Sequence, residues 1–184
     1  GGENMGDFIM SGRIVNFVAM KSRGLIIMTV AAVMCALLSG CIKDDLPEEH
    51  GLAIGDRVPV FSVTMSDGST FRSSELAGKH GVIVFFNTEC ADCRRELPKI
   101  QQAYDRVKDD PEYKVICIAR EEEEEEIAAY WRENGLTLPY SPQSDRAVYN
   151  LFATVSIPRM YITNRDLVID AVYDDTTPFD PDNL

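Results

Sequence analysis

The hydrophobic residues of this chain fall into runs and spacings that predict alternating strands and helices. Residues 81–86, Gly-Val-Ile-Val-Phe-Phe, form a continuous run that is typical of a strand buried on both faces of a sheet. Residues 113–119 have the same character and predict a second buried strand. After Cys93, apolar residues recur at intervals of three and four, which predicts a helix with one buried face. These residues are Leu97, Ile100, Tyr104 and Val107.

Further elements are predicted on both sides of this unit. Residues 60–64 and 70–72 flank a Gly-containing turn and predict a hairpin. Strands that alternate with helices indicate an α/β sheet. The remaining predicted elements are a helix over 121–134 that ends at Gly135, a short third helix over 145–152, and paired strands over 159–163 and 167–173.

An export signal is predicted near the amino-terminal end. Residues 20–23, Met-Lys-Ser-Arg, carry two positive charges and precede a mostly apolar run, residues 24–38, that is shorter than the ~20 residues of a membrane-spanning helix. The run ends in Leu38-Ser39-Gly40-Cys41, which resembles the lipobox of bacterial lipoproteins. This resemblance implies that Cys41 is acylated and anchors the protein to a membrane. The alternatives are an uncleaved anchor and a cleaved signal with an unrelated cysteine.

These features divide the chain into three parts. Residues 1–40 are predicted to be a signal peptide with an upstream extension, residues 41–53 a lipidated polar tether, and residues 54–184 the folded domain. Residues 41–45, Cys-Ile-Lys-Asp-Asp, also resemble a surface-export signal of lipoproteins. The expected location is therefore either the periplasmic face of a membrane or the cell surface.

Charge excludes one large class of partners. The 184 residues contain 30 Asp and Glu against 18 Lys and Arg, a net charge of −12. A nucleic-acid binder needs a basic surface that displaces counterions from phosphates, so nucleic acid is excluded as a general partner. The six consecutive glutamates 121–126 are interpreted as a solvated face at a helix start, where the helix dipole favours negative charge. Recognition of a partner by this run is the alternative.

The candidate chemistry lies in Cys90-Ala91-Asp92-Cys93, at the junction of a predicted strand and helix. Unpaired N–H groups at a helix start stabilise a thiolate, which favours Cys90 as the nucleophile. Cys93, one turn further inward, is placed to attack a mixed disulfide and release the partner. A structural disulfide is the plainer alternative. No second Cys or Cys/His pair has ligand spacing, so neither a metal nor another cofactor is expected.

Residues 85–98, Phe-Phe-Asn-Thr-Glu-Cys-Ala-Asp-Cys-Arg-Arg-Glu-Leu-Pro, resemble the active-site segment of the TlpA/ResA-like thiol-disulfide oxidoreductases. These are membrane-tethered, periplasmic proteins of the AhpC/TSA–thioredoxin superfamily. The resemblance extends over residues 55–173 and includes 134–139 and 155–158. It implies a thioredoxin-like α/β fold with a central mixed β-sheet flanked by helices and an N-terminal β-hairpin extension.

The resemblance also implies roles for residues outside the cysteine pair. Pro158 is expected to be cis and close to the Cys90 sulfur, with an ordinary turn proline as the alternative. The backbone of Ile157 is then free to pair with an extended substrate segment. Glu96 matches a glutamate near the family's disulfide that could move the proton of Cys93. A solvated helix residue is the alternative for Glu96.

The chain departs from the family pattern at several positions. Glu89 replaces a tryptophan, and Ala91-Asp92 replaces Gly-Pro or Glu-Pro between the cysteines. Carboxylates beside Cys90 oppose thiolate formation, so a reducing couple is predicted, although Arg94 and Arg95 act against this effect. Val84 occupies the place of thioredoxin's buried aspartate, and Cys117 is expected to be a buried, inert strand residue. No amphipathic helix follows residue 173, which suggests an incomplete chain or an exposed sheet face that permits oligomerisation.

The function predicted from the sequence is thiol-disulfide exchange with exported proteins through Cys90 and Cys93. The expected partners are protein disulfides or dithiols, an upstream thiol donor, and a membrane reached through Cys41. One alternative is a thioredoxin-fold peroxidase, but Ile83 and Asn87 stand where such enzymes carry Pro and Thr before the cysteine. The other is a non-catalytic surface binding module that works through residues 121–126.

Overall fold

The computed structural model describes residues 50–184, which contain a five-stranded mixed sheet in the order β5-β4-β3-β6-β7. β4 and β5 run parallel to β3, and β6 and β7 are antiparallel to their neighbours. The predicted signal peptide and Cys41 lie outside the described residues. The five strands are β3 (His80–Phe86), β4 (Tyr113–Ala119), β5 (Tyr140–Ser141), β6 (Arg159–Thr163) and β7 (Ile169–Tyr173).

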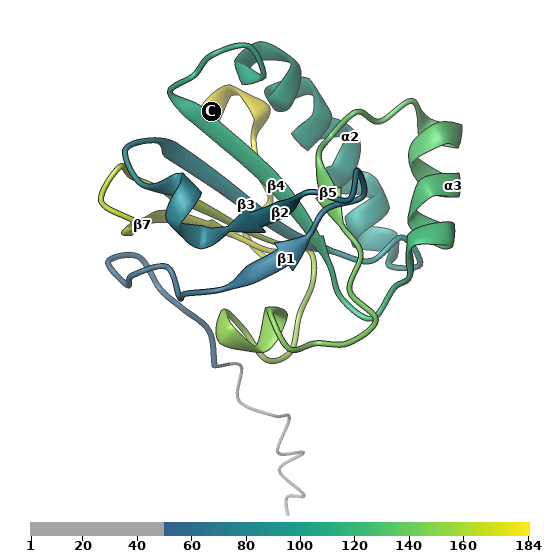
Figure 1. The fold of residues 1–184 in the computed structure, drawn as a ribbon, viewed down its shortest axis with the longest axis horizontal. Helices are drawn as coiled ribbons and strands as arrows, with labels where there is room; N and C mark the ends of the chain where they lie inside the picture. The colour runs from purple at the N-terminus through teal and green to yellow at the C-terminus, as the bar shows by residue number, and fades with distance from the viewer. Residues whose placement is uncertain (1–49) are drawn as a thin grey trace, which may run out of the picture. The chain divides into compact units, whose positions relative to one another are not determined.

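Successive residues of β3 point to opposite faces of the sheet and pack against different layers. Phe85 packs against Tyr149 and Phe152, with ring centroids 5.5 and 4.9 Å away. Phe152 also contacts Phe61, beside the predicted hairpin, which forms from β1 (Ser62–Thr64) and β2 (Thr70–Arg72) and precedes a 3-10 turn, η1 (Ser73–Leu76). In Figure 1 this hairpin lies on the near side of the sheet.

The opposite face of the sheet is covered by the two α-helices, α2 (Ala91–Val107) and α3 (Glu124–Asn134). Phe86 packs against Trp131 of α3 at 4.9 Å, and the Trp131 indole N–H donates to the Leu138 carbonyl at 2.9 Å. Gly135 ends α3 in the left-handed conformation (φ 64°), as the sequence predicts. The mixed sheet, the flanking helices and the hairpin confirm the thioredoxin-like α/β fold.

Several elements differ from the prediction in detail. The helix expected over 121–134 begins only at Glu124, and the strands expected over 60–64 and 167–173 begin at Ser62 and Ile169. One observed strand, β5, was not predicted. The third helix, expected over 145–152, is a single 3-10 turn, η2 (Tyr149–Leu151). Its first residues are engaged elsewhere, because the Asp145 carbonyl accepts from the Glu121 N–H and residue 143 forms a bridge with residue 122.

The segment after β7 contains only one 3-10 turn, η3 (Pro181–Asn183), among the described residues. Phe179 is buried and packs edge-to-face on Tyr173 at 5.3 Å. Arg106 of α2 pairs with Asp182 at 3.5 Å. The carboxyl-terminal segment therefore packs against α2 and β7 (Figure 1), where the sequence suggested an exposed sheet face.

No helix within residues 50–184 combines the length and apolar character needed to cross a membrane. Of the predicted tether, residues 50–53 are described, and there Gly51 forms a bridge with Ala153.

Candidate active site

Cys90 lies at the N-cap of α2, directly after the loop that follows β3. The Cys93 backbone N–H donates to the Cys90 sulfur at 3.4 Å, and the Cys90 Sγ–H donates to the Ile157 carbonyl at 3.5 Å. The sequence predicted a helix after Cys93, but α2 already begins at Ala91, so Cys93 lies in its first turn. The N–H groups of that turn have no partner within the helix, and they favour negative charge on the Cys90 sulfur.

The two sulfurs of the pair have different environments. Cys90 is half-buried, whereas Cys93 is fully buried. Burial raises the pKa of the Cys93 thiol strongly; the Asn87 backbone and the charge of Arg120 act in the opposite direction. The Cys90 sulfur is therefore the more accessible of the two, and burial favours the protonated form of Cys93.

Each carboxylate beside Cys90 is paired with an arginine of the same helix turn. Glu89 lies 3.3 Å from Arg94, and Asp92 forms an ion pair with Arg95. All four side chains are substantially exposed, so water screens these charges. Their effect on the Cys90 thiolate is smaller than the sequence alone suggests.

The Ile157–Pro158 peptide bond is cis, as the sequence predicts. Residues 154–158 form the loop that leads into β6, on the side of the Cys90 sulfur where Ile157 accepts its hydrogen bond. Sequence positions 90 and 157 are 67 residues apart. The fold therefore brings the two predicted parts of the site into contact.

Glu96 occupies α2 one turn after Cys93 and is buried. One of its oxygens accepts from the Lys99 ammonium at 2.8 Å, and the other has no hydrogen-bond partner among the described residues. Glu96 lines a cavity of about 10 Å³ together with Pro158 and Met160, a space close to the size of one water molecule. The burial of Glu96 argues against the solvated alternative.

Sequence reasoning missed two polar residues that shape the site. Glu122 is only 6% exposed, and its carboxylate accepts from both the backbone N–H (2.8 Å) and the hydroxyl of Thr88. Burial raises the pKa of Glu122, and the hydrogen bonds from Thr88 partly offset this. Glu122 was grouped with solvated glutamates, and nothing in a run of six identical residues marks it as different.

Asn87 holds the same loop from inside. Its side-chain oxygen accepts from the Glu89 N–H at 2.8 Å, and its amide donates to the Arg120 carbonyl at 3.1 Å. The loop between β3 and Cys90, in which Glu89 stands where the family has a tryptophan, is therefore held by hydrogen bonds at both Asn87 and Thr88. Within residues 50–184, no group of three or more His, Cys, Asp or Glu side chains is arranged to hold a metal ion.

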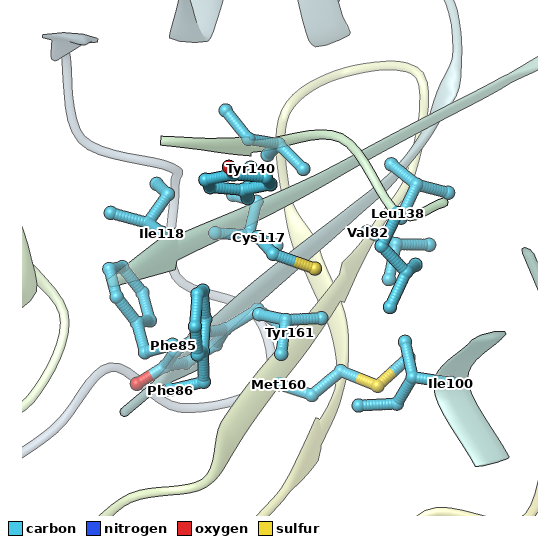
Figure 2. Packing of buried hydrophobic residues seen from close by; sticks show 14 of the residues in the cluster. Val82, Phe85, Phe86, Ile100, Cys117, Ile118, Leu138, Tyr140, Met160 and Tyr161 are labelled. Carbon is cyan, nitrogen blue, oxygen red and sulfur yellow. The ribbon is translucent and has the colours of Figure 1, made fainter. Parts of the chain in front are cut away.

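Cys117 lies in the middle of β4, paired in register with Val84. It is completely buried among apolar side chains, as Figure 2 shows, and burial raises its pKa strongly. Its surroundings are those of an inert core residue.

Comparisons with known proteins agree with this geometry. The sequence profile of the AhpC/TSA family matches residues 54–172. The thiol-disulfide oxidoreductase ResA of Bacillus thuringiensis (strain Al Hakam) is 24% identical over 141 residues, covering 73% of this chain and 80% of the relative.

Two solved structures are also similar. A candidate protein disulfide isomerase from Bacteroides thetaiotaomicron has a TM-score of 0.64 at 27% identity, covering 67% of this chain and 79% of that one. A thioredoxin-family thiol:disulfide interchange protein from Chlorobium tepidum TLS has a TM-score of 0.59 at 24% identity, covering 71% and 92%, and supports the fold. The chain therefore belongs to the AhpC/TSA family, and it is a thiol-disulfide oxidoreductase of thioredoxin-like fold similar to the ResA proteins.

Proposed function

We propose that the protein reduces disulfide bonds of exported proteins, with Cys90 as the attacking thiol and Cys93 as the resolving thiol. One observation carries the proposal: the half-buried Cys90 sulfur caps α2 and accepts from the N–H of the buried Cys93. The ResA-like relatives support the same reaction class.

The first step uses the exposure of Cys90. Its thiolate attacks one sulfur of a substrate disulfide, a bond forms between Cys90 and that sulfur, and the substrate's own S–S bond breaks. The second substrate sulfur leaves as a thiolate and takes a proton from water. The backbone of Ile157, beside the Cys90 sulfur, is the proposed pairing edge for the substrate segment.

The second step uses the burial of Cys93. Cys93 gives up its proton and attacks the Cys90 sulfur, so the Cys90–Cys93 disulfide forms and the bond to the substrate breaks. The substrate has then gained two electrons and two protons from the enzyme. An upstream dithiol donor reduces the Cys90–Cys93 disulfide and so returns the enzyme to its dithiol form. The buried Glu96, with one oxygen unpartnered, is the proposed acceptor of the Cys93 proton.

We expect a Glu96→Gln variant to slow release of the mixed disulfide by about 100-fold or more, because general bases typically contribute about 10²- to 10⁴-fold. The first attack by Cys90 should keep its rate. Single-turnover kinetics with a fluorescent disulfide substrate separate the two steps, and equal slowing of both would remove the proposed role of Glu96.

The direction of transfer is proposed to be reductive. No cation other than the paired Arg94 and Arg95 is contributed by the first turn of α2, and both are neutralised by Glu89 and Asp92. With both arginines paired, the N–H groups of the helix start are left to stabilise the Cys90 thiolate, and a less stabilised thiolate gives a less stabilised reduced form and so a lower potential. Equilibration of the protein with glutathione and dithiothreitol buffers tests this, and a potential near −120 mV, that of a strong oxidant, would contradict it.

The mechanism itself is tested by trapping the intermediate. A Cys93→Ser variant should accumulate a mixed disulfide between Cys90 and a protein substrate that contains scrambled disulfides, visible as a band that dithiothreitol removes. The double variant Cys90→Ser/Cys93→Ser is the matched control and should give no adduct. Adducts of equal yield in both variants would rule out Cys90 as the nucleophile.

We also propose that the protein is exported and held at a membrane through Cys41. The charged start, the apolar run and the lipobox-like residues 38–41 support this, and all of them lie outside the described residues. Cells that express the full chain and are fed labelled palmitate should label the wild-type protein but not Cys41→Ser. Cys117→Ser is the control and should label like the wild type.

A further inference from the structure

The loop that faces Cys90 is held by side chains that donate to three successive backbone carbonyls. Arg146 donates to the Thr154 carbonyl at 2.6 Å, and Arg120 donates to the Val155 carbonyl at 2.8 Å. The Tyr149 hydroxyl donates to the Ser156 carbonyl at 2.7 Å. The next carbonyl, that of Ile157, accepts from the Cys90 sulfur.

These three donors also support one another. The guanidinium groups of Arg120 and Arg146 lie 5.2 and 5.4 Å from the centroid of the Tyr149 ring, within cation–π range. The Glu121 carboxylate lies 3.8 and 4.0 Å from the two arginines. Glu121 itself adopts a left-handed backbone (φ 59°), a conformation that non-glycine residues seldom take. Four residues from two segments thus form one arrangement, called here the arginine clamp.

Arg120 connects this clamp to the cysteine side of the site. It directly follows β4, its N–H donates to the Phe86 carbonyl at 2.8 Å, and its carbonyl accepts from Asn87 at 3.1 Å. Its side chain is 19% exposed and reaches Val155. One residue therefore ties the loop before Cys90 to the loop opposite it.

We propose that Arg120, Arg146 and Tyr149 are positioning residues that hold the 154–157 loop so that the Ile157 backbone faces a protein substrate bound to Cys90. The inference rests on the proposed function for its kinetic consequence. Charged donors to carbonyls are stronger than neutral hydrogen bonds, so two guanidinium groups restrain the loop more firmly than its own turn does. Neither arginine touches a reacting sulfur, so neither is a catalytic residue.

The test compares a protein substrate with a small disulfide. The variants Arg120→Met and Arg146→Met keep much of the apolar side-chain bulk and lose the hydrogen-bond donors. The control is Arg132→Met, which removes one positive charge at an exposed position of α3. We expect KM for insulin to rise about 10-fold in the clamp variants, because misplaced binding geometry carries costs of this order, with kcat reduced by less. The first attack of Cys90 on 5,5′-dithiobis(2-nitrobenzoate) needs neither backbone pairing nor loss of the Cys93 proton, on which the Arg120 charge acts, so its rate should stay within about two-fold of the wild type.

Conservative variants separate positioning from general damage. Arg120→Lys keeps a charged donor and should fall between the wild type and Arg120→Met, and Tyr149→Phe, which loses only the hydroxyl, should raise KM less than either methionine variant. Equal losses with insulin and with the small disulfide would overturn the proposal, as would insulin kinetics like those of Arg132→Met.

A second measurement does not depend on the enzymatic assay. Amide hydrogen exchange of residues 155–157 should accelerate in Arg120→Met and Arg146→Met but not in Arg132→Met, because the clamp holds the loop whatever the substrate. Unchanged exchange would overturn the clamp. Failure of the wild type to reduce insulin, with accelerated exchange in the variants, would instead overturn the proposed function and keep the clamp.

Discussion

Two buried cysteines, Cys93 in the first turn of α2 and Cys117 in the middle of β4, have strongly raised pKa values, but only Cys93 has polar and charged neighbours that also act on its pKa. For Cys117 burial is the only cause. For Cys93 burial is the largest cause, but the Cys90 sulfur, the Asn87 backbone and the Arg120 charge also act on it. Burial without such neighbours leaves Cys117 an inert thiol. The groups around Cys93 give it a partner sulfur and charges that act on its proton.

Position in the fold explains this contrast. A strand in the centre of a sheet uses its N–H and C=O groups in ladder hydrogen bonds, so β4 has no free backbone N–H group to offer the Cys117 sulfur. The start of a helix has free N–H groups, and here one of them, from Cys93, meets the sulfur of Cys90. The pair therefore has a partner sulfur and a polar environment that Cys117 lacks.

The largest effect is expected from removing the nucleophile. A Cys90→Ser variant should lose insulin-reducing activity by at least about 100-fold, because a serine hydroxyl is not a usable thiolate at neutral pH. Cys117→Ala should keep its activity within about two-fold and lose only packing. Turbidity of reduced insulin measures both, and an equal loss in Cys117→Ala would place the reactive thiol in β4.

Alkylation should rank the three thiols in the same order as their exposure. In the native reduced protein, iodoacetamide should modify Cys90 about 100-fold faster than Cys93 or Cys117, because the latter two are buried and protonated. Peptide mass spectrometry after timed quenching gives the rates. Rapid labelling of Cys117 would show that β4 opens to solvent.

The raised pKa values also predict how stability changes with pH. Below pH 9, the ordinary value for these thiols, Cys93 and Cys117 are protonated in both the folded and the unfolded reduced chain. Above it the unfolded chain releases these protons and the folded chain keeps them, so the free energy of unfolding falls as pH rises. Each thiol contributes up to about 1.4 kcal/mol per pH unit.

Cys117→Ala isolates one of these contributions. Between pH 9 and pH 10 its free energy of unfolding should fall less steeply than that of the wild type, by up to about 1.4 kcal/mol per pH unit. Urea unfolding of the reduced proteins at several pH values measures both slopes. Identical slopes would mean that burial does not hold the proton on Cys117.

The smallest effect is expected from the charges around Cys90. Removing one exposed carboxylate in Glu89→Gln should raise the redox potential by no more than about 20 mV, because screened surface pairs contribute less than about 1 kcal/mol. Glu133→Gln, on the exposed side of α3, is the control for net charge. A shift above about 60 mV would show that Glu89 acts on the thiolate far more strongly than its exposure allows.

Much of the framework was predictable because its signals are local. The runs at 81–86 and 113–119 specify buried strands by their own composition, and the cysteine pair follows the first of them directly. The cis bond at Pro158 was predictable only from the family resemblance of residues 155–158, since no local pattern distinguishes it from a turn proline.

The failures share a cause, which is that partners far apart in the chain outweighed local preference. Residues 145–148 carry a helical pattern, but backbone hydrogen bonds from the segment before α3 divert them into a loop. β5, two residues long, has no pattern of its own and exists because β4 offers it a parallel edge.

By itself the sequence determined the order of strands and helices, the placement of Cys90 and Cys93 at a helix start, and the apolar character around Cys117. Only the tertiary structure decided which of the six glutamates is buried against Thr88. It also decided that Arg120 and Arg146 donate hydrogen bonds to the loop opposite Cys90. The physical reason is that backbone propensity and hydrophobic spacing act over a few residues. Burial and hydrogen bonding of a charged side chain depend on segments that meet only when the sheet has formed.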